Sequence, residues 1–256
     1  MRQTFVGSDK PLITAMIRCK TPEKYIEKIG LSLADGAEAI GVQLEWLECG
    51  YRTRSDLENI FSACCGLPVY VTAYRHGESQ GLPDEALSAL LMLARSSGAT
   101  MLDVMGDVFF RNTQYGMNVI PVDVARQLEL VDSLHEMGGE VMMSACVKGT
   151  LKVVEYEMIA ADQGTRRADI IGIFNNGVTR GELSNYRKSV ERISEMTEKK
   201  LQIEIAGEGI TFDDMASPPR LCMYRCVQSH GEFDSPDMPL LKKAIAIRDS
   251  IYKSKV

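Results

Sequence analysis

The feature that most constrains the fold is a regular alternation of short apolar segments and helical segments along the whole chain. The predicted strands are residues 11–18, 39–47, 67–75, 100–107, 140–147, 169–174, 201–206 and 221–227. Strict alternation predicts a parallel sheet, because parallel strands need long crossover connections that are usually helices. Eight strand units within 256 residues fit a (β/α)8 TIM barrel, and we predict a single α/β domain over residues 1–256.

The helical segments between these strands carry recognisable start and stop signals. One helix begins after Thr21, with Pro22 at its first helical position. The others are predicted at residues 84–97, 122–137, 151–163, 180–199 and 238–253, and a short proline-interrupted segment follows the seventh strand. An open doubly wound sheet would place a Gly-x-Gly-x-x-Gly turn after the first strand. The sequence there is Arg-Cys-Lys-Thr, which favours the barrel.

Composition narrows the classes of function and the compartment. The net charge is -6 with dispersed basic residues, which argues against a nucleic-acid surface. There is no apolar run of the ~20 residues that a membrane span needs, and the amino terminus lacks a signal-peptide core. Seven cysteines, an odd number without a Cys-x-x-Cys pair, argue against a disulfide framework. We expect a cytoplasmic protein that acts on a small molecule, without a nucleic-acid or membrane partner, and apolar helix faces compatible with a homodimer.

Barrel active sites are built at the carboxyl ends of the strands and in the loops that follow. This rule selects polar candidates at strand ends, among them Glu45, Arg75, His76, Asp103, Lys148, Asn175, Glu204, Gln228 and His230. Glu45 stands out because it lies in an otherwise apolar strand, and a buried carboxylate needs a partner. We predict Arg75, at the end of the neighbouring strand, as that partner. His76 is a candidate acid or base near neutral pH, or else an exposed loop residue.

Three further residues have competing interpretations. Lys148 is a candidate for a Schiff base if it is desolvated, for contact with a substrate anion at a helix start, or for a solvated loop position. Cys146 is predicted to be a packing residue, since no histidine stands beside it in the sequence. His230 follows the eighth strand, where loops of this architecture often bind anions, or it is a plain loop residue.

Several segments together resemble the type I 3-dehydroquinate dehydratases across nearly the whole chain. They are Pro-Leu-Ile-Thr from residue 11, Leu-Glu-Trp from 44, Pro-Val-Tyr-Val-Thr-Ala-Tyr-Arg from 68, Met-Leu-Asp-Val from 101 and Ala-Asp-Ile-Ile from 168. The resemblance implies a (β/α)8 barrel, typically dimeric and without a metal. It also implies dehydration of 3-dehydroquinate through an imine on a strand-six lysine, with a strand-five histidine moving protons.

The resemblance carries over only in part. It implies that Glu45 contacts substrate hydroxyls, that Arg75 binds substrate, and that Arg220 binds a carboxylate. At the two central positions the sequence departs from the family pattern: Cys146 stands where the histidine is expected and Gly172 where the imine lysine is expected. Without that amine the standard covalent route has no electron sink, and we expect the standard activity to be lost or very low.

Three functions follow as hypotheses. The first is a divergent barrel lyase or isomerase that abstracts a proton from a small polyhydroxylated carboxylate or keto acid, with catalytic candidates Glu45, His76, Lys148 and Glu204 and no cofactor. The second is a metal-dependent sugar-acid isomerase or epimerase, because acidic strand ends suit Mg²⁺ or Mn²⁺. The third is a non-catalytic binding protein derived from the dehydratase barrel.

Overall fold

The computed structural model describes residues 3–111, 114–117, 119–215, 218–231 and 238–253. In this part of the chain eight strands form one sheet, in the order β7-β6-β5-β4-β3-β2-β1-β8. The strands are β1 Leu12–Ile17, β2 Ala39–Gln43, β3 Val69–Thr72, β4 Met101–Met105, β5 Glu140–Lys148, β6 Ile170–Asn176, β7 Lys200–Ala206 and β8 Met223–Cys226. The strand pairs whose register is resolved are parallel, as the alternation predicts.

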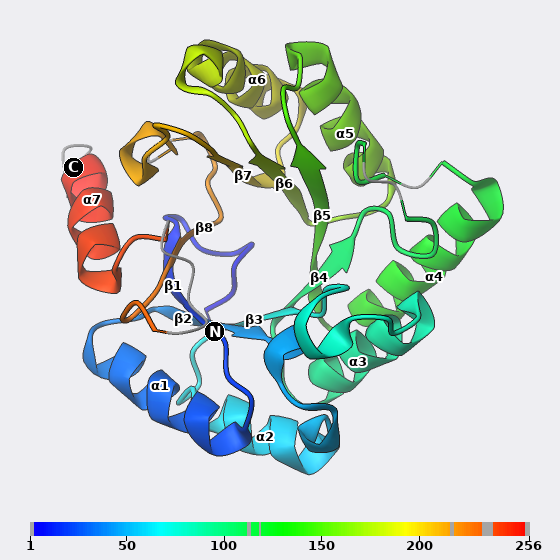
Figure 1. Cartoon of the computed structure of the whole chain (residues 1–256), viewed down its shortest axis with the longest axis vertical. Coiled ribbons are helices and arrows are strands. Elements are labelled where there is room, and N and C mark those ends of the chain that lie inside the picture. The colour runs from blue at the N-terminus through cyan, green and yellow to red at the C-terminus, as the bar shows by residue number, and fades with distance from the viewer. Residues whose placement is uncertain (1–2, 112–113, 118, 216–217, 232–237, 254–256) are drawn as a thin grey trace. The chain divides into compact units, whose positions relative to one another are not determined.

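Helices alternate with these strands (Figure 1). They are α1 Pro22–Ala34, α2 Arg54–Ser62, α3 Asp84–Ser96, α4 Pro121–Glu136, α5 Val153–Thr165, α6 Leu183–Met196 and α7 Leu241–Lys253. The helix α2 is not among those predicted from the sequence, and Thr53 caps it by accepting a hydrogen bond from the backbone of Asp56. After β7 the chain forms a short 3₁₀ turn, Phe212–Met215, where the sequence predicts a proline-interrupted segment.

The chain gathers into two compact units. Unit 1 comprises residues 1–103, 133–140 and 223–256, and unit 2 comprises residues 104–132 and 141–222. Unit 1 therefore holds β1, β2, β3 and β8, while unit 2 holds β5, β6 and β7. The interpretation of residues 1–256 as one domain stays a prediction.

In unit 2 the two faces of the sheet carry different side chains. Ala145, Ile173 and Ile203 belong to a buried cluster with Tyr156 of α5 and residues of α6, which cover one face. Because neighbouring side chains alternate across a strand, the other face carries two rows of residues in register. These rows are Ser144, Gly172 and Gln202, followed by Cys146, Phe174 and Glu204.

Unit 1 shows the same alternation. Thr14 and Met16 of β1 pair with Ala39 and Gly41 of β2, so these four residues share one face. A Cβ atom at Gly41 would lie 2.3 Å from the sulfur of Met16, so a side chain here would require the flexible end of Met16 to move. The same face continues through β3 with Tyr70 and Thr72, which stand in register with Gly41 and Gln43. Polar side chains thus accumulate on this face toward the carboxyl ends of β2 and β3.

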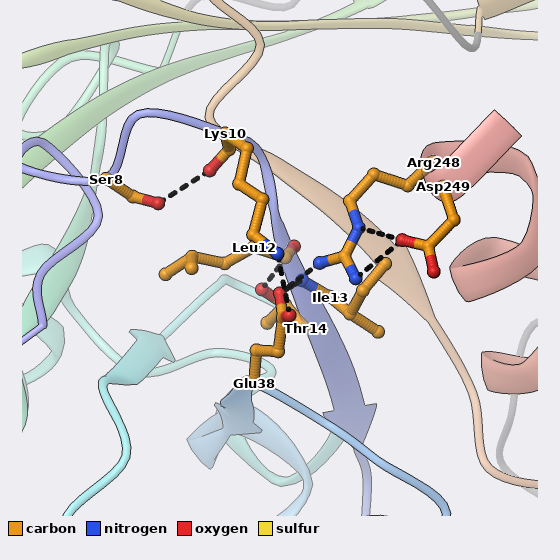
Figure 2. A network of polar contacts seen from close by, with 8 residues as sticks. All are labelled: Ser8, Lys10, Leu12, Ile13, Thr14, Glu38, Arg248 and Asp249. Carbon is orange, nitrogen blue, oxygen red and sulfur yellow. Dashed lines mark hydrogen bonds and ion pairs between the residues drawn. The ribbon is translucent and has the colours of Figure 1, made fainter. Parts of the chain in front are cut away.

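A polar network ties α7 to the start of β1 and β2 in unit 1 (Figure 2). Glu38 accepts a hydrogen bond from the Ile13 backbone at 3.2 Å and pairs with Arg248 and with Lys10. Arg248 also binds Asp249 at 3.1 Å, and its side chain is only 6 % exposed. A buried guanidinium needs such carboxylate partners, because a charge without them would be costly to desolvate.

Replacing Arg248 with methionine should lower the free energy of unfolding by about 1–3 kcal/mol, because Glu38 loses its buried partner. Urea denaturation of the variant and the parent measures the change. Lys242→Met removes a far more exposed cation, which pairs with Asp35, and should change the free energy by about 0.5 kcal/mol or less. Equal effects of the two substitutions on the free energy of unfolding would contradict the prediction that this network stabilises the fold.

Candidate functional site

Glu45 is the centre of a buried polar cluster in unit 1. β2 ends at Gln43, and Glu45 lies on the 3₁₀ turn Leu44–Trp46, where the sequence predicts that the strand continues. Its carboxylate is fully buried and accepts hydrogen bonds from Thr72 Oγ1 at 2.8 and 3.1 Å and from Gln43 Nε2 at 3.2 Å. Both donors lie on the face of the sheet described above. The prediction that Glu45 is a partnered, buried carboxylate is therefore confirmed.

His76 lies beside this carboxylate. Its Nε2 is 3.6 Å from Glu45 Oε1, an ion-pair distance when the imidazole is protonated, and its side chain is 51 % exposed. The imidazole ring contacts Trp46 at 5.9 Å and Tyr74 at 5.8 Å between ring centroids. Gly77 follows with φ +59°, and a Cβ atom there would lie 2.5 Å from the Glu45 carbonyl oxygen. The glycine therefore lets the His76 loop press against the turn that carries Glu45.

Arg18 extends the cluster through Gln43. Its Nε donates to Gln43 Oε1 at 2.7 Å, and Gln43 in turn donates to Glu45. The guanidinium lies over the Trp46 ring, 5.5 Å from the centroid, a cation–π arrangement. Arg18 and His76 are thus both held against the same indole ring. Trp46 and Thr72 are parts of the site that sequence reasoning did not select, because their role depends on contacts between strands.

Asp103 of β4 accepts hydrogen bonds from two phenols. Tyr70 donates to its Oδ2 at 2.5 Å, and Tyr74 donates to the same oxygen. Burial, and then the nearby charge of Asp103, raise the pKa of Tyr70 well above its ordinary value, so this phenol stays a protonated donor. Asp103, predicted as a substrate ligand, thus anchors Tyr74, whose ring contacts His76.

The structure corrects the predicted partner of Arg75. Its Nε and Nη2 donate to the two oxygens of Asp84 at 2.7 and 2.6 Å, a bidentate pair in which both side chains are largely buried. Arg75 lies beyond the end of β3, where the chain turns toward α3, and Asp84 is the first residue of that helix. This pair fastens the loop to α3, in place of the predicted pair with Glu45.

Arg220 lies near the amino-terminal edge of the sheet, whereas its predicted carboxylate-binding role is expected at the carboxyl-terminal edge. Its carbonyl accepts a hydrogen bond from Leu201, near the amino-terminal end of β7, whereas sites of this architecture lie at carboxyl ends. Its guanidinium donates to the Ser194 and Thr197 carbonyls and pairs with Glu198 at 2.8 Å. Arg220 thus satisfies carbonyl groups at the end of α6, and its carboxylate-binding role stays a prediction.

Asn175, Gln228 and His230 are three further residues that the sequence selects. Asn175 lies on the helix-facing side of β6 and donates to the Tyr156 hydroxyl at 2.9 Å, which differs from the predicted substrate contact. Gln228 donates to Asp35, at the end of α1, at 3.1 Å. His230 is exposed. The strand-end rule selected Asn175 without regard to the face of the strand on which it lies.

In unit 2 the predicted residues Cys146, Lys148 and Glu204 lie on the face of the sheet opposite α5 and α6. Cys146 is exposed and stands in register with Phe174 and, beyond it, Glu204, which accepts a hydrogen bond from Gln202 at 2.6 Å. Lys148 is exposed at the end of β5. All seven cysteines are free, and Cys146 is not the buried packing residue that the sequence predicts.

Gly172 is closely surrounded by the neighbouring strand. A Cβ atom at this position would lie 2.8 Å from the Met143 carbonyl oxygen and 3.2 Å from Met142 Cγ. The backbone oxygen cannot yield as a flexible side chain would. Position 172 therefore has no room for a lysine, or for any other side chain, unless β5 shifts.

The described residues were also compared with the requirements of a metal site and of a membrane-spanning helix. No group of three or more His, Cys, Asp or Glu side chains there is arranged to hold a metal ion. None of the helices in the same residues combines the length and the apolar character that crossing a membrane requires.

Comparison with solved structures shows which fold this arrangement belongs to. A type I 3-dehydroquinate dehydratase from Clostridium difficile, solved with covalently modified comenic acid, superposes with a TM-score of 0.79 at 14 % identity, over 97 % of this chain and 95 % of that one. The chain has the (β/α)8 barrel fold. The 3-dehydroquinate dehydratase from Geobacillus kaustophilus gives a TM-score of 0.76 at 11 % identity, over 97 % and 93 % of the two chains. The Enterococcus faecalis enzyme gives 0.74 at 12 %, over 96 % and 95 %.

The comparisons of sequence give no relatives. No family model matches the chain, and no curated protein matches it. Identities of 11–14 % to the solved dehydratases accompany a shared fold, and a shared fold does not determine the reaction. The function must therefore be argued from the residues of the site itself.

Proposed function

We propose that this protein is a divergent barrel enzyme that abstracts a proton next to the carbonyl group of a small polyhydroxylated carboxylate or keto acid. His76 takes the proton, and Glu45 stabilises the imidazolium that forms. The observation that carries the proposal is the placement of a half-exposed imidazole 3.6 Å from a fully buried carboxylate. The similarity of the fold to solved 3-dehydroquinate dehydratases also supports the proposal.

Glu45 is fully buried, and its Oε1 lies 3.6 Å from His76 Nε2. A carboxylate removed from water interacts strongly with a nearby cation, because the surroundings screen the charge less than water does. Thr72 and Gln43 hold the carboxylate in place, so little rearrangement is needed when the imidazole gains a proton. Trp46 and Tyr74 restrict the imidazole ring on its other sides.

The proposed step differs from the imine route of the dehydratases. A proton leaves the substrate carbon, its electron pair forms an enolate, and the proton moves to the His76 imidazole. No amine at Gly172 is required. Lys148 carries an exposed amine at the end of β5, and an imine on it would be trapped by borohydride in the presence of 3-dehydroquinate. Mass spectrometry showing an unmodified chain is the result that we expect.

Hydrogen–deuterium exchange tests the proposal even when the product of the reaction is unidentified. The protein is incubated in D₂O with a panel of cyclic and sugar keto acids, and NMR follows the loss of the proton next to the carbonyl. We expect exchange with at least one acid, lost in His76→Asn and kept in His135→Asn, which alters a histidine in the last turn of α4. A panel without exchange, or exchange unchanged in His76→Asn, would refute the proposal.

A binding protein is the second candidate, favoured by one specific observation. Gly172, which stands where the resemblance implies the imine lysine, is closed by the packing of β5. This alternative expects reversible binding of a hydroxy acid such as shikimate or 3-dehydroquinate without exchange or conversion. Thermal-shift binding assays run beside the exchange experiment separate the two candidates.

A further inference from the structure

We infer that Arg52 is a positioning residue, which holds the turn that carries Glu45 so that the carboxylate stays beside His76. This inference rests on the proposed function, in which Glu45 stabilises the protonated imidazole, and it adds the group that keeps the carboxylate in place. Arg52 directly follows the 3₁₀ turn Cys49–Tyr51, and its Nε donates to the Leu47 carbonyl oxygen at 2.9 Å. Neither its position in the sequence nor the resemblance marks it as a functional residue.

The 3₁₀ turn Leu44–Trp46 is held at both ends by side chains. Before the turn, the Tyr25 hydroxyl donates to the Gln43 carbonyl oxygen at 2.6 Å. After it, Arg52 donates to the Leu47 carbonyl oxygen. The turn itself is closed by a backbone hydrogen bond of 3.1 Å from Leu47 to its first residue. So short a 3₁₀ turn has few internal bonds, and its orientation therefore depends on these contacts from outside.

The hydrogen bond from Arg52 has a buried acceptor. Leu47 is fully buried, and a buried carbonyl group needs a donor. A guanidinium is a charged donor, and its hydrogen bonds are stronger than those between neutral groups. Without this donor the Leu47 carbonyl would have to rotate toward another partner. Because Glu45 lies only two residues earlier, we expect such a rotation to displace its carboxylate.

The charge of Arg52 also reaches the surroundings of the turn. Burial raises the pKa of Tyr25 well above its ordinary value, the charge of Glu45 raises it further, and the charge of Arg52 lowers it. The phenol stays protonated and keeps its hydrogen bond to Gln43. Arg52 thus contributes both a hydrogen bond and a positive charge to the segment that carries the proposed catalytic carboxylate.

His76 is held by contacts of its own. Its carbonyl oxygen accepts a hydrogen bond from the Ser79 backbone at 3.0 Å, and its ring contacts Tyr74. A displacement of the turn Leu44–Trp46 is therefore expected to change the distance of 3.6 Å between His76 and Glu45 instead of moving both residues together. The proposed proton transfer depends on that distance, because the carboxylate must stabilise the imidazolium as it forms.

Two substitutions separate the hydrogen bond of Arg52 from its charge. Arg52→Lys keeps the charge without the planar guanidinium, and Arg52→Gln keeps a donor without the charge. The matched control is Arg54→Gln, which removes an exposed cation that pairs with Glu58. Circular dichroism establishes that each variant is folded. Exchange rates at several substrate concentrations give kcat and KM. Fluorescence of Trp46, the single tryptophan and a residue of the turn, reports its surroundings without substrate.

We expect Arg52→Gln to lower kcat for exchange about 10- to 100-fold with little change in KM, because a misplaced carboxylate stabilises the imidazolium less well. Arg52→Lys should recover part of this loss, and it carries the test if Arg52→Gln does not fold. Trp46 fluorescence should change in Arg52→Gln and match the parent in Arg54→Gln.

The outcomes distinguish the inference from the reaction on which it rests. A folded Arg52→Gln protein with the parental kcat, or with unchanged Trp46 fluorescence, would overturn the positioning role and leave the proposed reaction standing. An equal loss of kcat in Arg54→Gln would also overturn that role, because the effect would then not depend on the contact with Leu47. A parent without exchange would refute the reaction and the positioning role together.

Discussion

The Glu45→Gln variant is expected to exchange or turn over its substrate about 10²–10⁴-fold more slowly than the parent. The carboxylate that stabilises the protonated His76 imidazole is removed, while the size of the side chain is kept. The effect should fall on kcat more than on KM, because the charge is needed when the imidazolium forms. Steady-state kinetics on a substrate found by the exchange experiment measures both constants.

The same variant should also be less stable. The Glu45 carboxylate accepts hydrogen bonds from Thr72 and Gln43, and it is fully buried. A glutamine would replace the charged acceptor of these two hydrogen bonds with a neutral amide, and we expect this loss to cost about 1–3 kcal/mol. Urea denaturation, followed by circular dichroism at the temperature of the kinetic assay, gives the free energy of unfolding. It also shows whether the kinetics compare folded proteins.

Glu58→Gln is a matched control for this experiment. Glu58 lies on α2 in an exposed pair with Arg54, so the same chemical change should leave rate and stability nearly unchanged. Glu45→Asp keeps the negative charge with a shorter side chain and should retain more activity than Glu45→Gln. A folded Glu45→Gln protein with the parental kcat would show that His76 does not depend on this carboxylate.

Restoring a lysine at the expected imine position should fail to restore the dehydratase chemistry. In Gly172→Lys the new Cβ atom would approach the Met143 carbonyl oxygen to 2.8 Å, so β5 or β6 must shift. Such overpacking costs about 1–3 kcal/mol and displaces the strand ends on which an imine would depend. We expect a less stable protein that forms no borohydride-trapped adduct with 3-dehydroquinate.

A second glycine provides the control for this substitution. Gly164 lies in α5 with no atoms within 4 Å of a built Cβ. Gly164→Lys should be neutral or raise the free energy of unfolding by up to about 1 kcal/mol, since lysine favours helix more than glycine does. Urea denaturation compares the two variants. Trapping of substrate at position 172 in a stable Gly172→Lys protein would show that only the amine separates this chain from the dehydratases.

Much of the fold could be predicted because the apolar strands are long enough to be read without tertiary contacts. The helix α2 was missed, although Leu57, Ile60 and Phe61 have helical spacing and Thr53 is a suitable cap. Its polar composition weakened the signal. The predicted ends of β2 and β3 lie several residues beyond the observed ends. The reason is that the 3₁₀ turn at Leu44–Trp46 and the loop to Arg75 continue the apolar pattern of the strands.

The site was predicted less completely, for a physical reason that differs between residues. Glu45 is conspicuous in the sequence because a carboxylate among apolar residues requires partners, and His76 stands close to a strand end. Arg75 and Arg220 were assigned by resemblance, and their partners Asp84 and the end of α6 become visible only after the chain has folded. Arg18 gains its orientation from Gln43 and Trp46, which belong to the next strand and the turn that follows it.

The sequence alone determined the alternation of strands and helices, the edge at which polar side chains gather, and the presence of Gly172 and Cys146 at the positions where the resemblance implies a lysine and a histidine. These properties follow from periodicity and residue identity, which are local. The tertiary structure decided which polar side chains interact. Glu45 interacts with Thr72 and His76, and Arg75 pairs with Asp84. It also decided that Gly172 is closed by β5. Such pairings depend on register and on the direction of side chains across strands, which residue spacing does not specify.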